Sequence, residues 1–340
     1  MNSLRMLQCT LVSLAMLAAP AAQAQELSAQ QLQQIDAHAL AAPFSAEQDA
    51  RQLAAYLTEG LSSEREKARA IYRWITDRIN YDAAAYLSGH SDASTVEEVL
   101  RKRISVCVGF AGLFEQLARA AGLEARTISG YAKAAGSLPG QHFDKANHAW
   151  NAVRIDGQWR LVDTTWGAGY LKEGKFQKEL SETFFLTAPE QLAFTHFPLD
   201  HQAQFQSTPH LSQAEFESLP ALEANFFHSS ISPLAVWSAL KNVQAEGGLV
   251  HTFTLPYHSV AVREAPLMYR LRREQAYAFR IEATLFEKMA IVQSDHWQEM
   301  QQQGTSFVHE LSSVWPGSLM VVGKPYGSEQ YTAILAYELQ

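Results

Sequence analysis

The sequence is poor in cysteine, has no surplus of basic charge, and has no long apolar run after residue 17. Its 35 Asp+Glu exceed its 27 Lys+Arg, and no basic stripe occurs. We therefore expect no nucleic acid partner, because a polyanion is bound by clustered cations. No later apolar run approaches the roughly 20 residues of a membrane-spanning helix. A hydrophobic fraction of 47% with 18% charged residues excludes disorder, collagen and coiled coil.

The first 24 residues have the layout of a secretory signal peptide. Met1–Arg5 is short and basic, Leu11–Ala19 is apolar, and Ala22-Gln23-Ala24 fits a small-x-small cleavage motif. We expect a periplasmic or secreted protein that is cleaved after this motif and has no membrane span. Cleavage removes Cys9 and leaves Cys107 as the only thiol, so no intramolecular disulfide can form.

Residues 25–205 are predicted to form an α+β domain with helices at its start. Capping-box patterns at Ser45, Ser63 and Thr95 each predict a helix N-terminus. A loop is expected over Ala83–Asp92.

The second half of this domain begins with a helix and continues with strands. Cys107–Ala121 has apolar residues at three- and four-residue steps, which predicts a buried helix. Asp156-Gly157 is a strong signal for a two-residue hairpin turn. The predicted strands are Ala125–Tyr131, His148–Ile155, Gln158–Thr165 and Phe184–Leu186.

Residues 206–224 are predicted to be a connector with one short helix, and residues 225–340 an all-β, sandwich-like domain. Its strand candidates alternate apolar and polar residues or are short apolar runs between turn signals such as Trp315-Pro316-Gly317. They are Leu249–Leu255, Met268–Leu271, Tyr277–Ala283, Met289–Gln293, Phe307–Leu311, Leu319–Val322 and Tyr331–Leu339. We expect this domain to offer a surface for recognising a partner or substrate.

Three residues form a candidate catalytic constellation. A helix N-terminus supplies positive potential and free N–H groups, which favour a thiolate at Cys107 and an oxyanion beside it. A two-residue turn at 156–157 makes the numbers of opposed hairpin residues sum to 313. His148 and Asp163 then lie diagonally on one face, together with Trp150, within reach of a His–Asp hydrogen bond. A lone histidine or aspartate would more often be structural, but the three together favour a nucleophile, a base and an orienting acid.

Three ordered motifs resemble the transglutaminase-like superfamily of papain-type folds. They are Ser105-Val106-Cys107-Val108-Gly109-Phe110-Ala111, Asn147-His148-Ala149-Trp150-Asn151 and Trp159-Arg160-Leu161-Val162-Asp163-Thr164-Thr165-Trp166-Gly167. The runs Phe184-Phe185-Leu186-Thr187-Ala188-Pro189-Glu190 and His196-Phe197-Pro198 are similar to the kyphoscoliosis-peptidase branch. The resemblance covers residues 65–205.

The resemblance implies a cysteine-bearing helix packed on an antiparallel sheet. It implies Cys107 as nucleophile, His148 as general base and Asp163 as the acid that orients it. One departure is Ser105, where the family usually has glycine; we expect only a small local change. Tyr81 resembles a family position near the site and is either a second oxyanion donor or a core tyrosine.

Other candidates have weaker support from the sequence. His142 is a rival base, but a glycine-bearing loop would hold it poorly. His196, His201 and Asp200 are interpreted as structural or solvated, because no zinc motif accompanies them. Trp150 is a candidate wall of the substrate pocket, and Trp166 is expected in the core. No cofactor or metal is predicted, although the resemblance to calcium-dependent transglutaminases leaves a metal site conceivable.

The sequence therefore predicts an exported cysteine hydrolase that cleaves an amide in a peptide or protein through a thioester. Two alternatives remain: a crosslinking acyltransferase, in which an amine resolves the thioester, and a non-catalytic binding module of the same fold. Substrates in the cell envelope fit an exported enzyme.

Overall fold

The computed structural model describes residues 27–89, 94–134, 137, 139–205, 210–222, 224–242, 248–253, 260–273, 275–312 and 317–339. The predicted signal peptide and its cleavage motif lie outside these residues, as do the end of the predicted strand at 254–255 and most of the turn at 315–317. Among the described residues, no helix is both long and apolar enough to cross a membrane.

The N-terminal part is helical, as predicted. Its helices are α1 (Ala29–Leu40), η1 (Ala46–Gln48), α2 (Ala50–Leu57), α3 (Glu64–Arg78), α4 (Ala83–Ser88), α5 (Val96–Lys102) and α6 (Cys107–Ala120). The capping boxes at Ser63 and Thr95 are confirmed. Ser45 makes no cap; Asp49 caps α2 instead. The predicted loop at 83–92 is wrong over α4, because Asp82 accepts a hydrogen bond from the Ala85 N–H and so starts a short helix.

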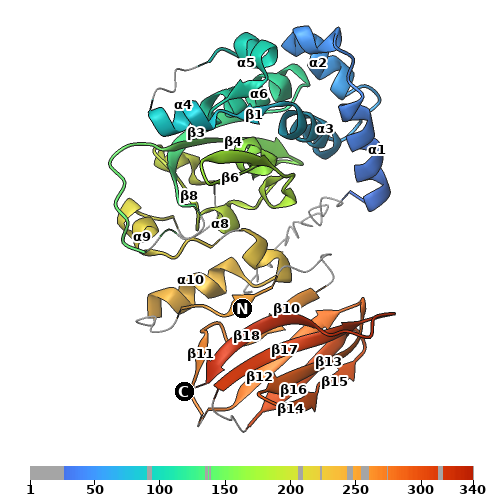
Figure 1. Cartoon of the computed structure of the whole chain (residues 1–340), viewed down its shortest axis with the longest axis vertical. Helices are drawn as coiled ribbons and strands as arrows, with labels where there is room; N and C mark the ends of the chain where they lie inside the picture. The colour runs from blue at the N-terminus through green and yellow to red at the C-terminus, as the bar shows by residue number, and fades with distance from the viewer. Residues whose placement is uncertain are drawn as a thin grey trace, which may run out of the picture.

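A four-stranded antiparallel sheet, ordered β5-β4-β3-β8, packs against α6 (Figure 1). Its strands are β3 (Ala125–Ala132), β4 (His148–Ile155), β5 (Gln158–Val162) and β8 (His196–Pro198). The hairpin register is the predicted one, with Asn151 opposite Val162. Asp156 and Gly157 both have positive φ, +50° and +79°, as the tight turn between β4 and β5 requires.

Two predictions downstream of this hairpin are wrong. β5 ends at Val162, because Asp163 caps α7 (Thr164–Ala168) and turns the chain. The expected strand at 184–186 is instead the 3₁₀ turn η2 (Glu182–Phe184), and only Thr187 forms a bridge, to Leu161. The remaining elements here are β1 (Asn80–Tyr81), β2 (Ile104–Ser105), β6 (Gly169–Lys172), β7 (Lys175–Lys178) and α8 (Pro189–Leu192).

Helices continue further than the sequence predicted before the C-terminal strands begin. They are η3 (His201–Gln204), α9 (Gln213–Ser218), η4 (Ala224–Ser229) and α10 (Pro233–Asn242). The short connector helix is therefore present as α9, but the expectation of strands from about residue 225 is wrong for residues 224–242. Figure 1 shows α10 lying between the N-terminal lobe and the C-terminal sheets.

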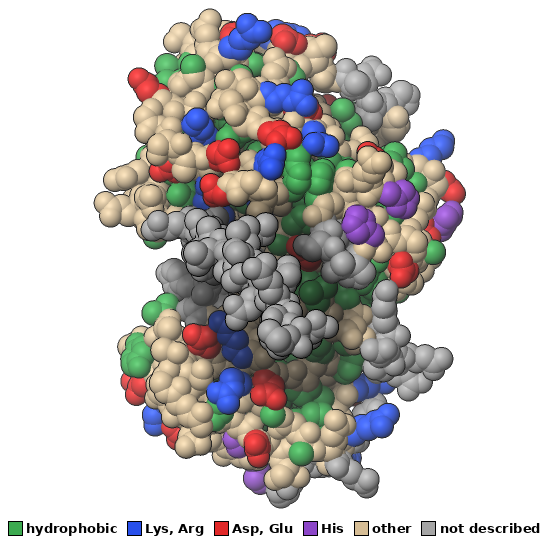
Figure 2. Space-filling view, turned by 180° about the vertical axis from the view of Figure 1, so that it is seen from behind, with side chains coloured by type: hydrophobic (Ala, Val, Ile, Leu, Met, Phe, Trp, Pro, Cys, Tyr) green, Lys and Arg blue, Asp and Glu red, His purple; other side chains and the backbone are tan. Residues whose placement is uncertain are grey.

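The C-terminal part is all-β, as expected. One sheet is ordered β10-β12-β16-β15, and the other β11-β18-β17-β13-β14 with β9 beside β18. The strands are β9 (His251–Thr252), β10 (Val260–Glu264), β11 (Arg270–Leu271), β12 (Tyr277–Ala283), β13 (Phe286–Gln293), β14 (His296–Glu299), β15 (Gln301–Gln303), β16 (Ser306–Leu311), β17 (Gly317–Pro325) and β18 (Thr332–Leu339). On the face shown in Figure 2, acidic and basic side chains are interspersed, without a large area of one sign.

One buried apolar cluster joins the two lobes through the helices between them. Phe194 contacts Phe227 and Trp237 with ring centroids 5.2 and 4.9 Å apart, and Phe197 stacks on Phe216 at 5.3 Å. The same cluster continues into the inner faces of both C-terminal sheets. The connector helices are therefore part of a shared core.

Candidate active site

Cys107 is the first residue of α6 and is partly exposed. The N-cap position is held by Val106, whose side chain has no acceptor for the leading N–H groups. Those groups have no partner within a helix and carry the positive end of its dipole. The start of α6 therefore leaves hydrogen-bond donors and a positive field beside the sulfur, which would stabilise an oxyanion formed there.

Ser105 stands two residues before the cysteine, at the position where the resembling family has glycine. It is buried, and its Oγ has no hydrogen-bond partner among the described residues. A Cβ at Gly109, one turn into the helix, would lie 2.0 Å from this Oγ. The absence of a side chain at Gly109 is therefore what makes room for the serine.

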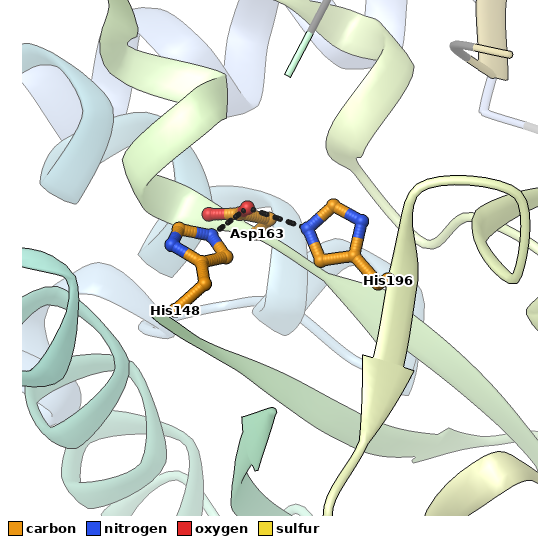
Figure 3. A group of neighbouring side chains, drawn as sticks. All are labelled: His148, Asp163 and His196. Atoms are coloured by element: carbon orange, nitrogen blue, oxygen red, sulfur yellow. Dashed lines mark hydrogen bonds and ion pairs between the residues drawn. The ribbon is translucent and has the colours of Figure 1, made fainter. Parts of the chain in front are cut away.

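His148, the first residue of β4, lies against Asp163 (Figure 3). Its Nε2 is 2.7 Å from Asp163 Oδ2, and both side chains are buried. The other carboxylate oxygen, Oδ1, accepts the backbone N–H groups of Thr165 at 2.8 Å and Trp166 at 3.0 Å. Asp163 thus caps α7 and holds an imidazole at the same time. The diagonal contact expected from the hairpin register is present.

The electrostatics of this pair favour a charged imidazole and a charged carboxylate. Burial by itself would lower the pKa of His148, but the charge of Asp163, its hydrogen bond and the Cys107 side chain raise it to about 10. Burial would raise the pKa of Asp163, yet His148 and His196 hold it well below its usual range. Since Nε2 is occupied by the carboxylate, Nδ1 is the ring nitrogen left for the sulfur.

His196 is a member of the site that the sequence interpretation missed. It is the first residue of β8, and its Nε2 lies 3.2 Å from the same Asp163 Oδ2 (Figure 3). Its Nδ1 is 2.8 Å from the Thr195 hydroxyl. The side chain is buried, so of the two interpretations, structural or solvated, the structural one applies, and burial lowers the pKa of His196.

Two tryptophans flank the histidines, and the position of Trp166 differs from the prediction. Trp150, a candidate wall of the substrate pocket, is only 2% exposed, packs edge-on against His196 at 4.9 Å and lines a small cavity with it. Trp166, expected in the core, is partly exposed and covers His148 at 5.2 Å and His196 at 4.7 Å. The cause is the start of α7 directly after Asp163, which turns Trp166 towards the imidazoles.

Tyr81 lies beside the site. It pairs with Ser105 across β1 and β2, and its pKa is raised by burial and then by the charge of Cys107, so its hydroxyl stays protonated. Its ring also packs against Phe110 and Phe176, so both roles considered for it are compatible with its position.

The other candidates lie away from Asp163. His142 is exposed and pairs with Glu217 of α9 at 2.9 Å. His201 is exposed and packs edge-on against Phe197, while Asp200 caps η3.

His148, Asp163 and His196 offer three ligand atoms within 4.8 Å of one another, a set that could bind a transition metal. However, both Nε2 atoms lie at hydrogen-bond distances from one oxygen, and the second oxygen already accepts two backbone N–H groups. The distances among these three side chains are those of an internal hydrogen-bond network.

Residues 51–164 match the transglutaminase-like superfamily, and this range contains Cys107, His148 and Asp163. The chain therefore contains a transglutaminase-like domain. Its transglutaminase-like domain is 35% identical to human kyphoscoliosis peptidase over 207 residues, which are 60% of this chain and 30% of that protein. The mouse kyphoscoliosis peptidase is 38% identical over 161 residues, 46% of this chain and 24% of that protein. These similarities place the domain on the kyphoscoliosis-peptidase branch.

A LIM and transglutaminase domain protein of Caenorhabditis elegans is 32% identical over 189 residues, 52% of this chain and 26% of that protein. The chain thus spans less than a third of the length of these relatives. A crystal structure of red sea bream transglutaminase superposes with a TM-score of 0.29 at 10% identity, over 92% of this chain and 58% of that one. So loose a superposition adds nothing about function.

Proposed function

We propose that the transglutaminase-like domain is a cysteine hydrolase that cleaves an amide bond in a peptide or protein. The observation that supports this most is the buried His148–Asp163 pair, with the Cys107 side chain among the groups that raise the pKa of His148. Cys107 starts an uncapped helix, its side chain raises the pKa of His148, and His148 is held by Asp163 at 2.7 Å. A thiolate–imidazolium pair with an orienting carboxylate is the arrangement that nucleophilic catalysis by cysteine requires.

In the proposed acylation, the Cys107 thiolate attacks the carbonyl carbon of the amide. The carbonyl oxygen becomes an oxyanion, to which the free N–H at the start of α6 can donate a hydrogen bond. The Tyr81 hydroxyl is our candidate for the second donor, because it is protonated and Tyr81 pairs with Ser105, two residues before the cysteine. The C–N bond then breaks, the imidazolium of His148 gives its proton to the departing amine, and a thioester remains on Cys107.

In the proposed deacylation, neutral His148 takes a proton from a water molecule, and the resulting hydroxide attacks the thioester carbon. The C–S bond breaks, the carboxylic acid leaves, and the proton returns the Cys107–His148 pair to its starting state. Asp163 keeps the imidazole oriented throughout and stays ionised. An amine in place of water would give a crosslinked product instead, so the competing nucleophile decides between hydrolase and acyltransferase.

The test is turnover of a complex peptide mixture by the wild-type protein and by C107A. New peptide termini that appear only with the wild type support the hydrolase. Incorporation of a labelled primary amine without new termini would favour the acyltransferase. No covalent change of any peptide, with an intact fold, would favour a binding module.

We also propose export, which rests on the sequence of residues 1–24 alone. The substrate would then be a peptide or protein of the cell envelope or outside it, and the C-terminal sheets would take part in recognising it. Fractionation of expressing cells and sequencing of the purified protein's N-terminus test this. A start at Gln25 in the exported fraction supports export, and retention of residues 1–24 in the cytoplasm contradicts it.

A further inference from the structure

Asp163 presents a single oxygen, Oδ2, to two imidazoles. His148 Nε2 lies 2.7 Å from it and His196 Nε2 lies 3.2 Å from it, as Figure 3 shows, while Oδ1 is occupied by two backbone N–H groups. One imidazole is enough for a cysteine, histidine and aspartate mechanism. The second therefore needs an explanation of its own.

The carboxylate beside His196 indicates which of its nitrogens carries hydrogen. Nε2 faces a carboxylate oxygen, so it must be protonated to donate. Nδ1 lies 2.8 Å from the Thr195 hydroxyl, which also lies 3.2 Å from the Leu192 carbonyl oxygen and can donate its one proton to only one of the two. Burial lowers the pKa of His196, so the ring is neutral, a donor on one side and an acceptor on the other.

We propose that His196 is a positioning residue that weakens the hold of Asp163 on His148, an inference that rests on the proposed function. By donating to the same oxygen, it draws part of the carboxylate's charge away from the catalytic imidazole. The imidazolium then releases its proton to the departing amine more readily than it would beside an undivided carboxylate. A general acid is most effective when its pKa lies near the working pH.

Few other charged or titratable groups face His148 among the described residues. Asp163 faces it from the start of α7, His196 from β8 and Cys107 from α6. Tyr72 and Tyr81 lie near Asp163, but burial raises the pKa of both, so their hydroxyls stay protonated. His196 is therefore the group that can be changed to alter the charge on Asp163 without touching the sulfur.

Three variants separate tuning from a purely structural role. H196F keeps an aromatic ring and removes the donor, and H196Q keeps an N–H donor. H201F is the matched control, because His201 is an exposed histidine of the same segment that makes no bond to Asp163. Two readouts are needed: the ring ¹⁵N NMR titration of His148, and the pH dependence of Cys107 alkylation by iodoacetamide, mapped by mass spectrometry to distinguish it from Cys9.

In H196F we expect the His148 titration to move to higher pH by about half a unit to one unit, because a hydrogen bond to a charged group is lost from the shared oxygen. The upper step of the Cys107 alkylation profile, at which His148 loses its proton, should move to higher pH by a similar amount. H196Q and H201F should give the same His148 titration and the same Cys107 alkylation profile as the wild type. T195V, which leaves the imidazole in place without its hydroxyl donor, should shift both curves less in the same direction, and it serves if H196F does not fold.

If the His148 titration and the Cys107 alkylation profile are the same in the wild type, H196F and T195V, and the variants differ only by a lower melting temperature, His196 has a packing role alone. A shift in the opposite direction would also overturn the proposal. So would tight Zn²⁺ binding by the wild type that H196F abolishes, because the group would then be a metal centre. If Cys107 of the wild type is alkylated like a free thiol, the proposed function itself fails. If the wild type shows an activated Cys107 and H196F shows the same profile, only the role proposed for His196 fails.

Discussion

At the scale of single residues, the His148–Asp163 pair makes stability depend on pH in a defined direction. The pKa of His148 is raised to about 10 in the folded protein, against about 6.5 for a free histidine. Protonation of His148 therefore stabilises the fold fully below about pH 6.5, and this contribution is lost as the pH rises towards 10. The pKa of Asp163 is lowered, so its contribution is present above about pH 4 and is lost in stronger acid.

We expect the melting temperature of H148Q to lie below that of the wild type, with the largest difference between about pH 4 and 6.5. Glutamine does not titrate, so H148Q lacks the stabilisation that a protonated His148 gives the wild type in this range. The margin should narrow as the pH approaches 10. Thermal unfolding followed by circular dichroism across this range checks it, with H201Q as a control that should follow the wild type. A margin that stays constant from pH 4 to 10 would contradict the ion pair.

The sequence predicted part of the site at this scale, for a local reason. His148 and Asp163 belong to one hairpin, so a two-residue turn is enough to fix their relation. His196 reaches Asp163 only because β8 pairs with β3, a contact between distant segments that no local pattern reports. The motif around His196 is part of the resemblance, but its spacing in the sequence does not predict which side chain His196 contacts.

At the scale of elements, the start of α6 depends on the fit between Ser105 and Gly109. A Cβ at Gly109 would meet the Oγ and Cβ of Ser105 at 2.0 and 2.8 Å and a methyl of Val99 at 2.9 Å. We expect G109A to destabilise the fold by about 1–3 kcal/mol, although alanine is the better helix former. G112A on the same helix is the control, since its Cβ would have only one neighbour, at 4.0 Å, and should be neutral or stabilising by up to about 1 kcal/mol.

The S105G/G109A double variant tests the cause. Removing the serine side chain relieves two of the three contacts, so the double variant should recover at least half of the loss measured for G109A alone. Chemical denaturation of the four proteins of this cycle gives the coupling. Strict additivity of the two single changes would show that Ser105 and Gly109 do not constrain each other.

Most elements followed from local signals, and the exceptions have identifiable causes. The amphipathic helix at Cys107 and the hairpin at 156–157 were predicted because their periodicity and turn residues are strong. The end of β5 was misplaced because Asp163 is an N-cap, a signal that competes with strand continuation. Helix α4 was missed because its start depends on the single cap at Asp82.

At the scale of the whole molecule, the domain boundary predicted near residue 205 cuts through a shared core. Phe194 and Phe197 pack against Phe227, Trp237 and Phe216, which all follow that boundary. Each buried phenylalanine contributes about 1.5–3 kcal/mol by its removal from water. No local pattern predicts this shared core, because the helices between the lobes are short and their partners are far away in the chain.

We expect a fragment of residues 27–242 to be more stable than a fragment of residues 27–205, which should be strongly destabilised or aggregated. The longer fragment keeps Phe194 and Phe197 covered, and the shorter one exposes them to water. Near-ultraviolet circular dichroism and thermal unfolding of the two fragments compare them directly. Equal stability of both would mean that the connector helices are dispensable for the transglutaminase-like domain.

The central claim is that Cys107 works as a thiolate paired with the imidazolium of His148. The most direct test is the rate of Cys107 alkylation by iodoacetamide at pH 6, in the wild type and in H148A, with H142A as a control for loss of an exposed histidine. We expect rapid labelling of Cys107 in the wild type and in H142A, and labelling slowed at least about ten-fold in H148A. Equal rates in all three proteins would contradict it.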